Sequence, residues 1–398
     1  KRRSQGRPMK TYDVIIVGAG SVGLPLSWNL AAKGFRVAVL DHEASWGRGQ
    51  NRAAIGGIRA THSDPAKIKI CLESIRIVST MKETHGLDLE WRQGGYLYVA
   101  FDRGMEASFL SLLEIQKASG LDIDWIGPDS VVERAPGLNR EGLLGGTFSP
   151  GDGFASPLAA STAFHKLAMD AGVDFFFGDR VDAIAMKNGR VQNMEAGGET
   201  WSAALYVNAA GAEASELASL AGLDIPIHPD CHEAGVTEPV QRFMEPMIVD
   251  IRPDAESGNY YFYQAETGQV VFCITPRPQI WGRDKDSTSN FLPLCLRRML
   301  ELYPRLRNLR VRRTWRGMYP MTPDGLPLLG YPEEARNFLH AVGMCGQGFM
   351  MGPGLGKILA ECIESGGCAQ NPAGSTEYGF IFRDLACSRT FEHSEFLK

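Results

Sequence analysis

The segment that most constrains the fold lies near the start of the chain and reads YDVIIVGAGSVGLPLSWNLAAKGFRVAVLD, residues 12–41. Its first part, DVIIVGAG, is apolar without alternation, as is typical of a central strand in a parallel sheet. A glycine turn, a helical stretch with Pro25 in its first turn and a second apolar strand follow. We expect Ser21 to cap this helix, because serine side chains accept hydrogen bonds from the first main-chain amides. This order predicts a parallel α/β unit of the nucleotide-binding type.

The glycines of the turn, Gly18, Gly20 and Gly23, have the spacing GxGxxG. The first allows a tight turn, the second lets the main chain approach a pyrophosphate, and the third permits close packing of helix and strand. Asp41 ends the second strand, where a carboxylate can bind ribose hydroxyls. The motif predicts a dinucleotide site but leaves open whether the dinucleotide is NAD or FAD.

A second glycine-rich segment, AVGMCGQGFMMGPGLG at residues 341–356, reads as strand, glycine loop and helix. Gly343, Gly346 and Gly348 would let main-chain amides reach a ligand, and the helix N-terminus would face it. A flavin needs such a second contact, because this long cofactor spans more of the fold than one βαβ unit. The pair of segments therefore favours FAD. An NAD-dependent dehydrogenase remains the alternative, although the chain offers no clear His-Asp or Tyr-Lys catalytic set.

Composition excludes several classes of protein. The net charge of −5 argues against a nucleic-acid binder. The eight cysteines are scattered without a CxxC pair, which favours a reducing compartment and free thiols over a disulfide framework, a metal site or an iron–sulfur cluster. No apolar run reaches the roughly 20 residues of a membrane helix. We therefore expect a cytoplasmic protein with no membrane span and no bound metal.

The rest of the chain mixes helices with strand-rich stretches. Helical patterns cover about 65–85, 157–172 and 291–302. Asn188-Gly189 predicts the turn of a β-hairpin. Nucleotide-type units thus occur at both ends of the sequence, which predicts a nucleotide domain assembled from separated pieces.

Four stretches in matching order, VIIVGAGSVG…VLD, GGIR, RTWRGMYPMTPDGLPLLG and GQGFMMGPGLG, resemble the D-amino acid oxidase-like flavoproteins. The resemblance runs from about Tyr12 to Glu364. Within this family the motifs most resemble the β subunit of dye-linked L-proline dehydrogenase, followed by sarcosine oxidase. The resemblance implies oxidation of the C–N bond of an amino acid, with the hydride passing to flavin N5.

The resemblance also implies the architecture, which is an α/β fold with an FAD-binding Rossmann-type domain built from discontinuous segments. The second domain would bind the substrate with a large, mostly antiparallel sheet. The expected boundaries are 9–90, 154–225 and 325–366 for the FAD-binding domain, 91–153 and 226–324 for the substrate domain, and 1–8 and 367–398 for extensions.

The cofactor residues are implied motif by motif. The first motif would hold the pyrophosphate and ribose, the loop at 50–52 would lie along the pyrophosphate and flavin, the main chain of Val181 would meet the adenine, and the last motif would line the flavin ring. The cysteine that binds flavin covalently in monomeric sarcosine oxidase would fall at Gly317, which implies non-covalent FAD. The candidates are Gly18, Gly20, Ser21, Val22, Gly23, Asp41, His42, Gln50, Asn51, Arg52, Val181, Ala210, Gly211, Gly317, Gly343, Gly346, Gln347, Gly348, Phe349 and Met350.

The substrate candidates are Arg59, Tyr261, Tyr319 and Met350. Tyr319 stands where glycine oxidase and D-amino acid oxidase have a carboxylate-binding arginine, which counts against both activities. Arg59, in GGIR, matches the anchoring arginine of sarcosine oxidase, and Met350 replaces that enzyme's second anchor, a lysine. A guanidinium suits a carboxylate bidentately. The alternative is that Arg59 packs against loop backbone or phosphate.

Two further features concern the electron acceptor and partners. The strand GQVVFCI has no lysine near Phe272, where sarcosine oxidase places a lysine that aids oxygen reduction, so we favour a dehydrogenase. The alternatives are an oxidase that uses O2 and an FAD-binding subunit of a hetero-oligomeric electron-transfer complex. The basic run RLRNLRVRRTWRG is either a solvated strand face or a docking surface for a second subunit or electron acceptor.

Overall fold

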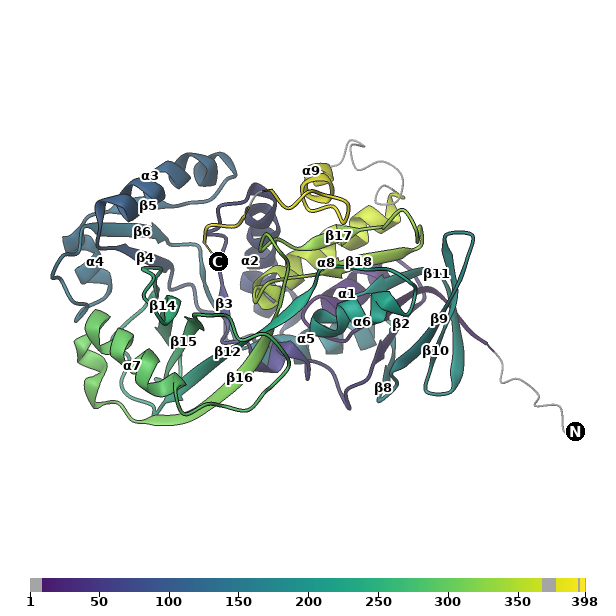
Figure 1. The fold of residues 1–398 in the computed structure, drawn as a ribbon, viewed down its shortest axis with the longest axis horizontal. Coiled ribbons are helices and arrows are strands. Elements are labelled where there is room, and N and C mark those ends of the chain that lie inside the picture. Colours follow the sequence, from purple (N-terminus) through teal and green to yellow (C-terminus); the bar gives the residue numbers. More distant parts are fainter. Residues whose placement is uncertain (1–8, 367–376, 393, 398) are drawn as a thin grey trace, which may run out of the picture. The chain divides into compact units, whose positions relative to one another are not determined.

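The computed structural model describes residues 9–366, 377–392 and 394–397 (Figure 1). The chain forms two compact units, each built from separated segments. The described parts of 1–52, 160–228 and 320–394 make the first unit, and those of 53–159, 229–319 and 395–398 make the second. This confirms the expected α/β class with a discontinuous nucleotide-type domain and a second domain with a large sheet.

The first unit is centred on an eight-stranded sheet with the strand path β17-β18-β11-β1-β2-β8. The strands β18, β11, β1, β2 and β8 run parallel, as the unbroken apolar pattern of β1 predicts, and β17 is antiparallel to β18. Their bounds are β1 (Lys10–Val17), β2 (Val37–Asp41), β8 (Asp174–Phe177), β11 (Glu199–Asn208), β17 (Leu328–Gly330) and β18 (Phe338–Val342).

A hairpin of β9 (Val181–Lys187) and β10 (Arg190–Ala196) extends this sheet beside β11. Its turn residues Asn188 and Gly189 both have positive φ, 53° and 68°. Both central residues of a type I′ turn need positive φ, so the predicted hairpin is confirmed.

The helices of the first unit are α1 (Gly23–Ala32), α5 (Pro157–Asp170), α6 (Ala214–Ser219), α8 (Gly348–Glu364) and α9 (Gly379–Asp384), with the short 3-10 helices η1 (Gln50–Ala53) and η2 (Gly211–Glu213). The first residues of α5 and the last of η1 belong to the second unit. Helices α1 and α8 lie side by side (Figure 1) because glycines remove the side chains between them. A Cβ atom on Gly356 would lie 2.7 Å from the Leu26 amide nitrogen.

The second unit contains another eight-stranded sheet, with the order β16-β12-β15-β14-β13-β4-β6-β5. Strands β13 and β4 pair in parallel, whereas β12–β15, β15–β14, β14–β13, β4–β6 and β6–β5 pair antiparallel. The bounds are β4 (Tyr96–Ala100), β5 (Asp124–Ile126), β6 (Gly145–Ser149), β12 (His228–Thr237), β13 (Met247–Asp250), β14 (Ser257–Gln264), β15 (Val270–Pro276) and β16 (Val311–Met321).

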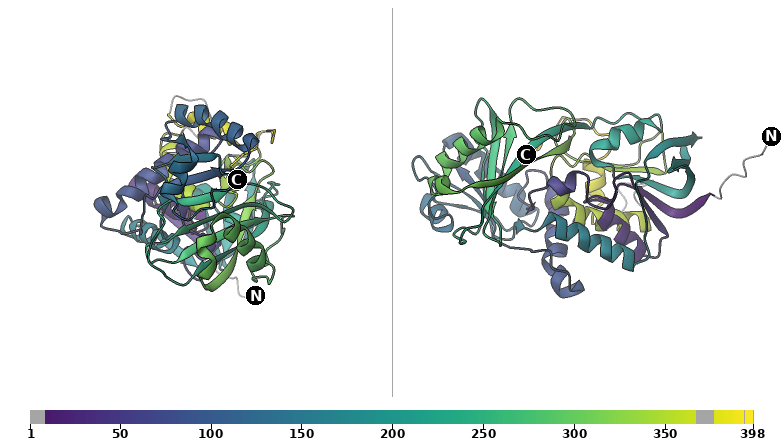
Figure 2. Two further views of the ribbon diagram at one scale, coloured as in Figure 1. Left: turned by 90° about the vertical axis from the view of Figure 1, so that its left-hand side faces the viewer. Right: turned by 90° about the horizontal axis from the view of Figure 1, so that it is seen from below.

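The two faces of this second sheet bury different side chains, as strand alternation requires. One face packs against α4 (Pro128–Arg134) and α7 (Phe291–Leu302), which runs beside the strands in Figure 2. The other face carries Tyr96, Tyr98 and Tyr261 and packs against α3 (Arg103–Ala118). We call this second face the tyrosine face. The unit also contains the two-stranded sheet of β3 (Gly57–Ile58) and β7 (Gly153–Phe154), helix α2 (Pro65–His85) and the 3-10 helix η3 (Pro304–Asn308).

Several expectations differ from the structure. Residues 53–90, which we expected in the FAD-binding domain, cluster with the second unit, because β3 pairs with β7 and α2 contacts α3. The helices expected over about 65–85 and 291–302 are confirmed, and the one expected over 157–172 ends at Asp170. Within the expected extension 367–398, the described residue Arg389 is tied to the first unit by two hydrogen bonds to Asp324, at 2.8 and 2.9 Å. The extension 1–8 lies outside the described residues.

The spacing of the cysteines favoured free thiols over a disulfide framework, yet Cys362 is disulfide-bonded. A single bridge requires no paired motif, so scattered spacing does not exclude one. The cysteines at 71, 231, 273, 295, 345 and 387 are free. In the part of the chain that the structure describes, no helix has the length and hydrophobicity of a membrane span.

Candidate functional site

The three glycines of the first motif each serve a different packing need. Gly18 has φ of +114°, and a Cβ there would lie 2.4 Å from the Ala209 carbonyl oxygen. A Cβ on Gly23 would lie 1.9 Å from the Gly18 carbonyl oxygen, so the third glycine permits the helix to start close to the strand. Gly20 faces open space, with no atom within 4 Å of its Cβ position. The loop thus keeps one glycine free for a ligand.

Helix α1 begins without a side-chain cap. Its N-cap residue is Val22, and no side chain accepts from its first amides, so the predicted cap from Ser21 is wrong. The helix starts at Gly23, so the N-cap position falls one residue after Ser21. Helix α2, by contrast, is capped by Asp64, whose side chain accepts from the Lys67 amide. Uncapped amides at a helix start suit an anion such as a pyrophosphate.

Asp41 lies at the end of β2, beside this loop. Its carboxylate accepts from the amides of Ala19 at 2.7 Å and Glu43 at 2.8 Å. Burial raises the pKa of Asp41. The exposed His42 side chain is 3.9 Å from the same carboxylate. Asp41 therefore ties the glycine loop to the second strand and holds an acceptor where the motif predicts a ribose.

The second glycine segment turns sharply before α8. Gly343, Cys345 and Gly346 all have positive φ, at 71°, 48° and 82°. The Cys345 thiol is held in place because it donates to the Gly343 carbonyl oxygen at 3.1 Å, and the Thr322 amide donates to its sulfur at 3.4 Å. The thiol is therefore a packing group of the turn. Helix α8 then starts at Gly348 with no side-chain cap, like α1.

The two uncapped helix starts lie next to each other. A Cβ on Gly348 would be 3.1 Å from the Ser21 hydroxyl oxygen. A small pocket here is lined by α1, α5 and α8 and includes Ser21, Asn51 and Phe349. Gln347 is buried, and its Oε1 atom has no hydrogen-bond partner among the described residues. A buried amide oxygen without a partner is costly and points to a donor that a ligand supplies.

The remaining cofactor candidates of the first unit surround these loops. In η1, Gln50 accepts from the Ala212 amide at 3.2 Å, Asn51 is buried against Ser161, and Arg52 is exposed. Gly211 has φ of +58° and contacts the Gln50 side chain. Ala210 precedes it and bonds through its amide to Asn208, at 3.2 Å. Val181 is buried at the start of β9, and Met350 is half-buried in the first turn of α8.

Taken together, the residues of the first unit fit a dinucleotide such as FAD. The fit rests on the open face of Gly20, on the two adjacent uncapped helix starts and on the unpaired amide oxygen of Gln347. All cofactor candidates except Gly317 lie in this unit. Gly317 lies in β16 of the second unit, where a Cβ would be 2.7 Å from the Ala53 side chain. A glycine there offers no thiol for a covalent link.

In the second unit, Arg59 follows β3 and is 5% exposed. Its guanidinium donates to the main-chain oxygens of Thr61 and Leu397, the latter at 2.6 Å, and lies 3.0 Å from Nδ1 of His62. It also lies over the ring of Tyr98 on the tyrosine face, 5.7 Å from the centroid. The guanidinium therefore binds loop backbone in this structure, which is the alternative that the sequence left open.

Asp152 fixes the loop that carries Arg59. Its buried carboxylate accepts from the Ala60 amide at 2.8 Å and from the Thr61 amide and hydroxyl at 3.3 and 2.6 Å. Burial raises the pKa of Asp152 to about 6. The sequence did not reveal this residue, because its partners lie about 90 positions away.

Tyr261 of β14 and Tyr319 of β16 meet through their phenol oxygens, which are 2.9 Å apart. Burial raises the pKa of both phenols, so both remain neutral. The ring of His232 stacks on Tyr319 with centroids 3.8 Å apart, and its Nε2 atom lies 3.0 Å from the Asp230 carboxylate. The structure thus brings together two of the predicted substrate residues and adds His232.

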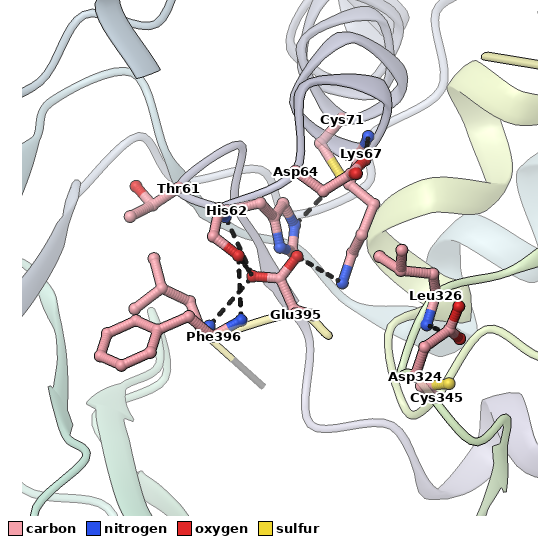
Figure 3. A network of polar contacts seen from close by, with 12 residues as sticks. Thr61, His62, Asp64, Lys67, Cys71, Asp324, Leu326, Cys345, Glu395 and Phe396 are labelled. Carbon is pink, nitrogen blue, oxygen red and sulfur yellow. Dashed lines mark hydrogen bonds and ion pairs between the residues drawn. The ribbon is translucent and has the colours of Figure 1, made fainter. Parts of the chain in front are cut away.

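A further cluster at the start of α2 was not predicted (Figure 3). Lys67 is fully buried, and its ammonium lies 3.2 Å from the carboxylate of Glu395. Ser63 donates to the same carboxylate through its amide at 2.9 Å and its hydroxyl at 2.8 Å. The signal available in the sequence was Lys67 itself, a lysine beside the apolar face that begins at Ile68. Its partner could not be inferred from spacing.

Comparison with known proteins agrees with these features. The sequence model of the "FAD dependent oxidoreductase" family matches residues 13–362. The chain is 27% identical to sarcosine oxidase subunit beta of an Arthrobacter species over 365 residues, 89% of this chain and 88% of that protein. It is 25% identical to glycine oxidase of Geobacillus kaustophilus, over 89% of this chain and 93% of that protein. The crystal structure of L-proline dehydrogenase from P. horikoshii is similar with a TM-score of 0.85 and 28% identity, covering 96% of this chain and all of that one.

Proposed function

Because this chain belongs to the family of FAD-dependent oxidoreductases, we propose that it oxidises the C–N bond of a small secondary or N-alkyl amino acid. The substrate would resemble proline or sarcosine, and the electrons would pass to an acceptor other than O2. The relatives with sarcosine, glycine and L-proline in their names support an amino-acid substrate. FAD, when bound, supplies the hydride acceptor.

The observation that carries this proposal is the neutral phenol pair of Tyr261 and Tyr319 on a unit that also buries Arg59. A guanidinium binds a carboxylate with two parallel hydrogen bonds. A neutral phenol can accept a hydrogen bond from an amine N–H while its partner phenol orients it. Met350 lies in the first unit and offers no charge, so Arg59 is the one cation among the four substrate candidates.

The choice of a dehydrogenase rests on strand β15. Val271 shares the tyrosine face with Tyr261 and Tyr263, and Cys273 pairs directly with Tyr261. Phe272 points to the opposite face, where it packs against Phe291 of α7. Strand β15 therefore places no lysine on the tyrosine face. A fixed positive charge stabilises developing superoxide, so its absence from this strand favours another acceptor.

A second candidate function is a role as one subunit of a larger electron-transfer complex. It is favoured by exposed arginines on and just before the edge strand β16. β16 is an edge strand, and Arg312 and Arg313 on it are exposed, as are Arg305, Arg307 and Arg310 just before it. These arginines stand out in a chain of net charge −5, and they suit an acidic partner. Native mass measurement of the protein purified from its source would show a second polypeptide if this holds. A monomer with full dye-linked turnover would contradict it.

The function is tested with the FAD-loaded protein under anaerobic conditions. We expect L-proline or sarcosine to bleach the flavin absorption, with glycine and D-alanine bleaching it more slowly. Turnover with an artificial dye should exceed turnover with O2. Arg59→Lys should raise KM more than it lowers kcat, because an ammonium cannot form the bidentate pair. A protein that no amino acid bleaches would refute the proposal, and equal turnover with O2 and dye would refute the choice of a dehydrogenase.

A further inference from the structure

The segment Glu395–Leu397 forms hydrogen bonds with Arg59 and with polar groups near it. Leu397 is buried on the tyrosine face, and its carbonyl oxygen accepts the 2.6 Å bond from Arg59. The Phe396 amide donates to the Ser63 hydroxyl at 2.9 Å, and the Leu397 amide donates to the Glu395 carboxylate at 3.0 Å. Every residue of this segment thus makes a polar contact near the start of α2.

The binding partners of Glu395 form a receptor for a carboxylate. One carboxylate oxygen accepts from the Ser63 amide and hydroxyl, and the other faces the buried ammonium of Lys67 at 3.2 Å. Although burial raises the pKa of Glu395, the charge of Lys67, the two hydrogen bonds from Ser63 and the charge of Arg59 lower it to about 2, so the carboxylate is charged. Arg59 and Lys67 are both at most 5% exposed, and two buried cations in one place favour an anion strongly.

The two titratable side chains next to Arg59 and Lys67, those of His62 and Cys71, carry no charge and so do not change the charge of this receptor. Burial and the charges of Arg59 and Lys67 keep the pKa of His62 well below its usual value, so its imidazole is neutral. The His62 ring contacts Arg59 on one side and the Cys71 sulfur on the other, at 3.5 Å. Burial raises the pKa of Cys71 to about 12, so the thiol carries no charge either. Within this cluster, Glu395 and Asp152 are the acidic groups that act on Arg59.

We propose that the Glu395–Leu397 segment is a built-in competitor for the carboxylate of the amino-acid substrate at Arg59, held in place by the Ser63–Lys67 receptor. The substrate carboxylate binds when the Leu397 carbonyl leaves the guanidinium. This rests on the proposed function, in which Arg59 anchors the substrate. The exchange costs little in geometry, because a carbonyl oxygen and a carboxylate oxygen accept the same N–H bond.

The same contacts explain how the segment can leave as a unit. Phe396 is 48% exposed, so the middle of the segment has no buried side chain. The segment is therefore kept in place by the hydrogen bonds and ion pair of Glu395 and by the buried side chain of Leu397. Weakening the Glu395 bonds should therefore loosen the carbonyl at Arg59 as well, although that carbonyl is two residues away.

The test uses the FAD-loaded protein and sodium acetate as the carboxylate probe. Amide hydrogen exchange of the wild type should rise at Phe396 and Leu397 in saturating acetate and not in sodium chloride of equal strength. Glu395→Gln should bind acetate roughly tenfold more tightly than the wild type. The neutral amide loses the charge-assisted bonds of Glu395 to Ser63 and Lys67, so the segment competes less strongly. Glu392→Gln, an exposed carboxylate on the same stretch, should bind acetate as the wild type does.

The outcomes separate this proposal from the function. Unchanged exchange in acetate, together with equal acetate affinity in the wild type and in Glu395→Gln, would overturn the competitor, since the segment would then be a permanent part of the fold. If Glu395→Gln does not fold, the exchange experiment on the wild type decides alone. If hydrogen exchange depends on acetate but no amino acid bleaches the flavin, the segment is still a competitor for carboxylates and the proposed substrate class is refuted.

Discussion

Gly352 of α8 packs so closely against Ser21 that a Cβ atom on Gly352 would lie 1.8 Å from the Ser21 carbonyl oxygen. The contact is between main chains, so neither side can yield by changing a rotamer. It joins the two glycine-rich helix starts that form the candidate cofactor site.

Gly352→Ala should therefore destabilise the protein by about 1–3 kcal/mol, the usual cost of overpacking, and weaken FAD retention. Gly104→Ala is the matched control in another helix. There the nearest atom to the added Cβ is Oδ1 of the Asp102 side chain, at 3.2 Å, and no main-chain atom from outside the helix lies within 4 Å. Urea unfolding of both variants checks the prediction, and an equal effect of the two would contradict it.

Gly20→Ala and Gly23→Ala should separate cofactor binding from folding. Gly20 faces open space, so its alanine variant should keep the unfolding temperature of the FAD-free protein and weaken FAD binding by about 1–3 kcal/mol. Gly23→Ala should lower the stability of the FAD-free protein, because its Cβ would meet the Gly18 carbonyl oxygen. Thermal unfolding of stripped protein and fluorescence titration with FAD measure the two effects. Loss of apoprotein stability in Gly20→Ala would show that the face of Gly20 is not open.

His340 should make stability fall at acidic pH. Its ring is buried in β18, neither nitrogen has a hydrogen-bond partner among the described residues, and burial lowers its pKa to about 4. An unfolded histidine has a pKa near 6.5. Between about pH 6.5 and pH 4, the unfolded chain therefore binds a proton at His340 that the folded chain does not bind, and this favours unfolding. The penalty is absent above pH 6.5 and should reach about 2 kcal/mol at pH 5.

His340→Leu should remove this part of the pH dependence, seen as a smaller loss of unfolding free energy between pH 7.5 and pH 5. His85→Gln, at an exposed position, should leave the loss as large as in the wild type. If His340→Leu loses as much stability on acidification as the wild type, the histidine is protonated in the folded protein.

Tyr261→Phe and Tyr319→Phe should each lower kcat/KM about tenfold, the worth of one hydrogen bond near 1.4 kcal/mol. Both phenols have pKa values raised by burial, so neither should appear in the pH profile of dye-linked turnover. The apparent pKa values of that profile should be unchanged in both variants. A shift of the alkaline limb in Tyr319→Phe would mean that this phenol transfers a proton.

The parts of the fold that the sequence predicted are those encoded by contacts between near neighbours. The glycine motif, the helix at 65–85 and the Asn188-Gly189 turn depend on residues within a few positions of each other. The helix after the motif was predicted, but the Ser21 cap was wrong, because a motif that binds an anion leaves its amides free instead of satisfying them.

The unpredicted parts depend on pairings across long stretches of chain. Arg59 was predicted to anchor a carboxylate or to pack against loop backbone or phosphate, yet its partner Leu397 is 338 positions away. Lys67 stands out as a lysine beside an apolar helix face, but no local pattern pairs it with Glu395, which lies far along the chain. Residues 53–90 joined the second unit for a similar reason, because the pairing of β3 with β7 outweighs their proximity in sequence to the first motif.

The discontinuous make-up of both units sets the order in which the chain can fold during its synthesis. Strand β1 is complete at Val17, whereas β18 and α8 extend to Glu364. At roughly 5–20 residues per second, a ribosome needs on the order of tens of seconds to make the intervening chain. Throughout that time the apolar strands of the first sheet lack one edge, and the cofactor site lacks its second helix start. The nascent chain therefore exposes this edge of the first sheet until β18 emerges, and FAD can meet both helix starts of the candidate site only after α8 has been made.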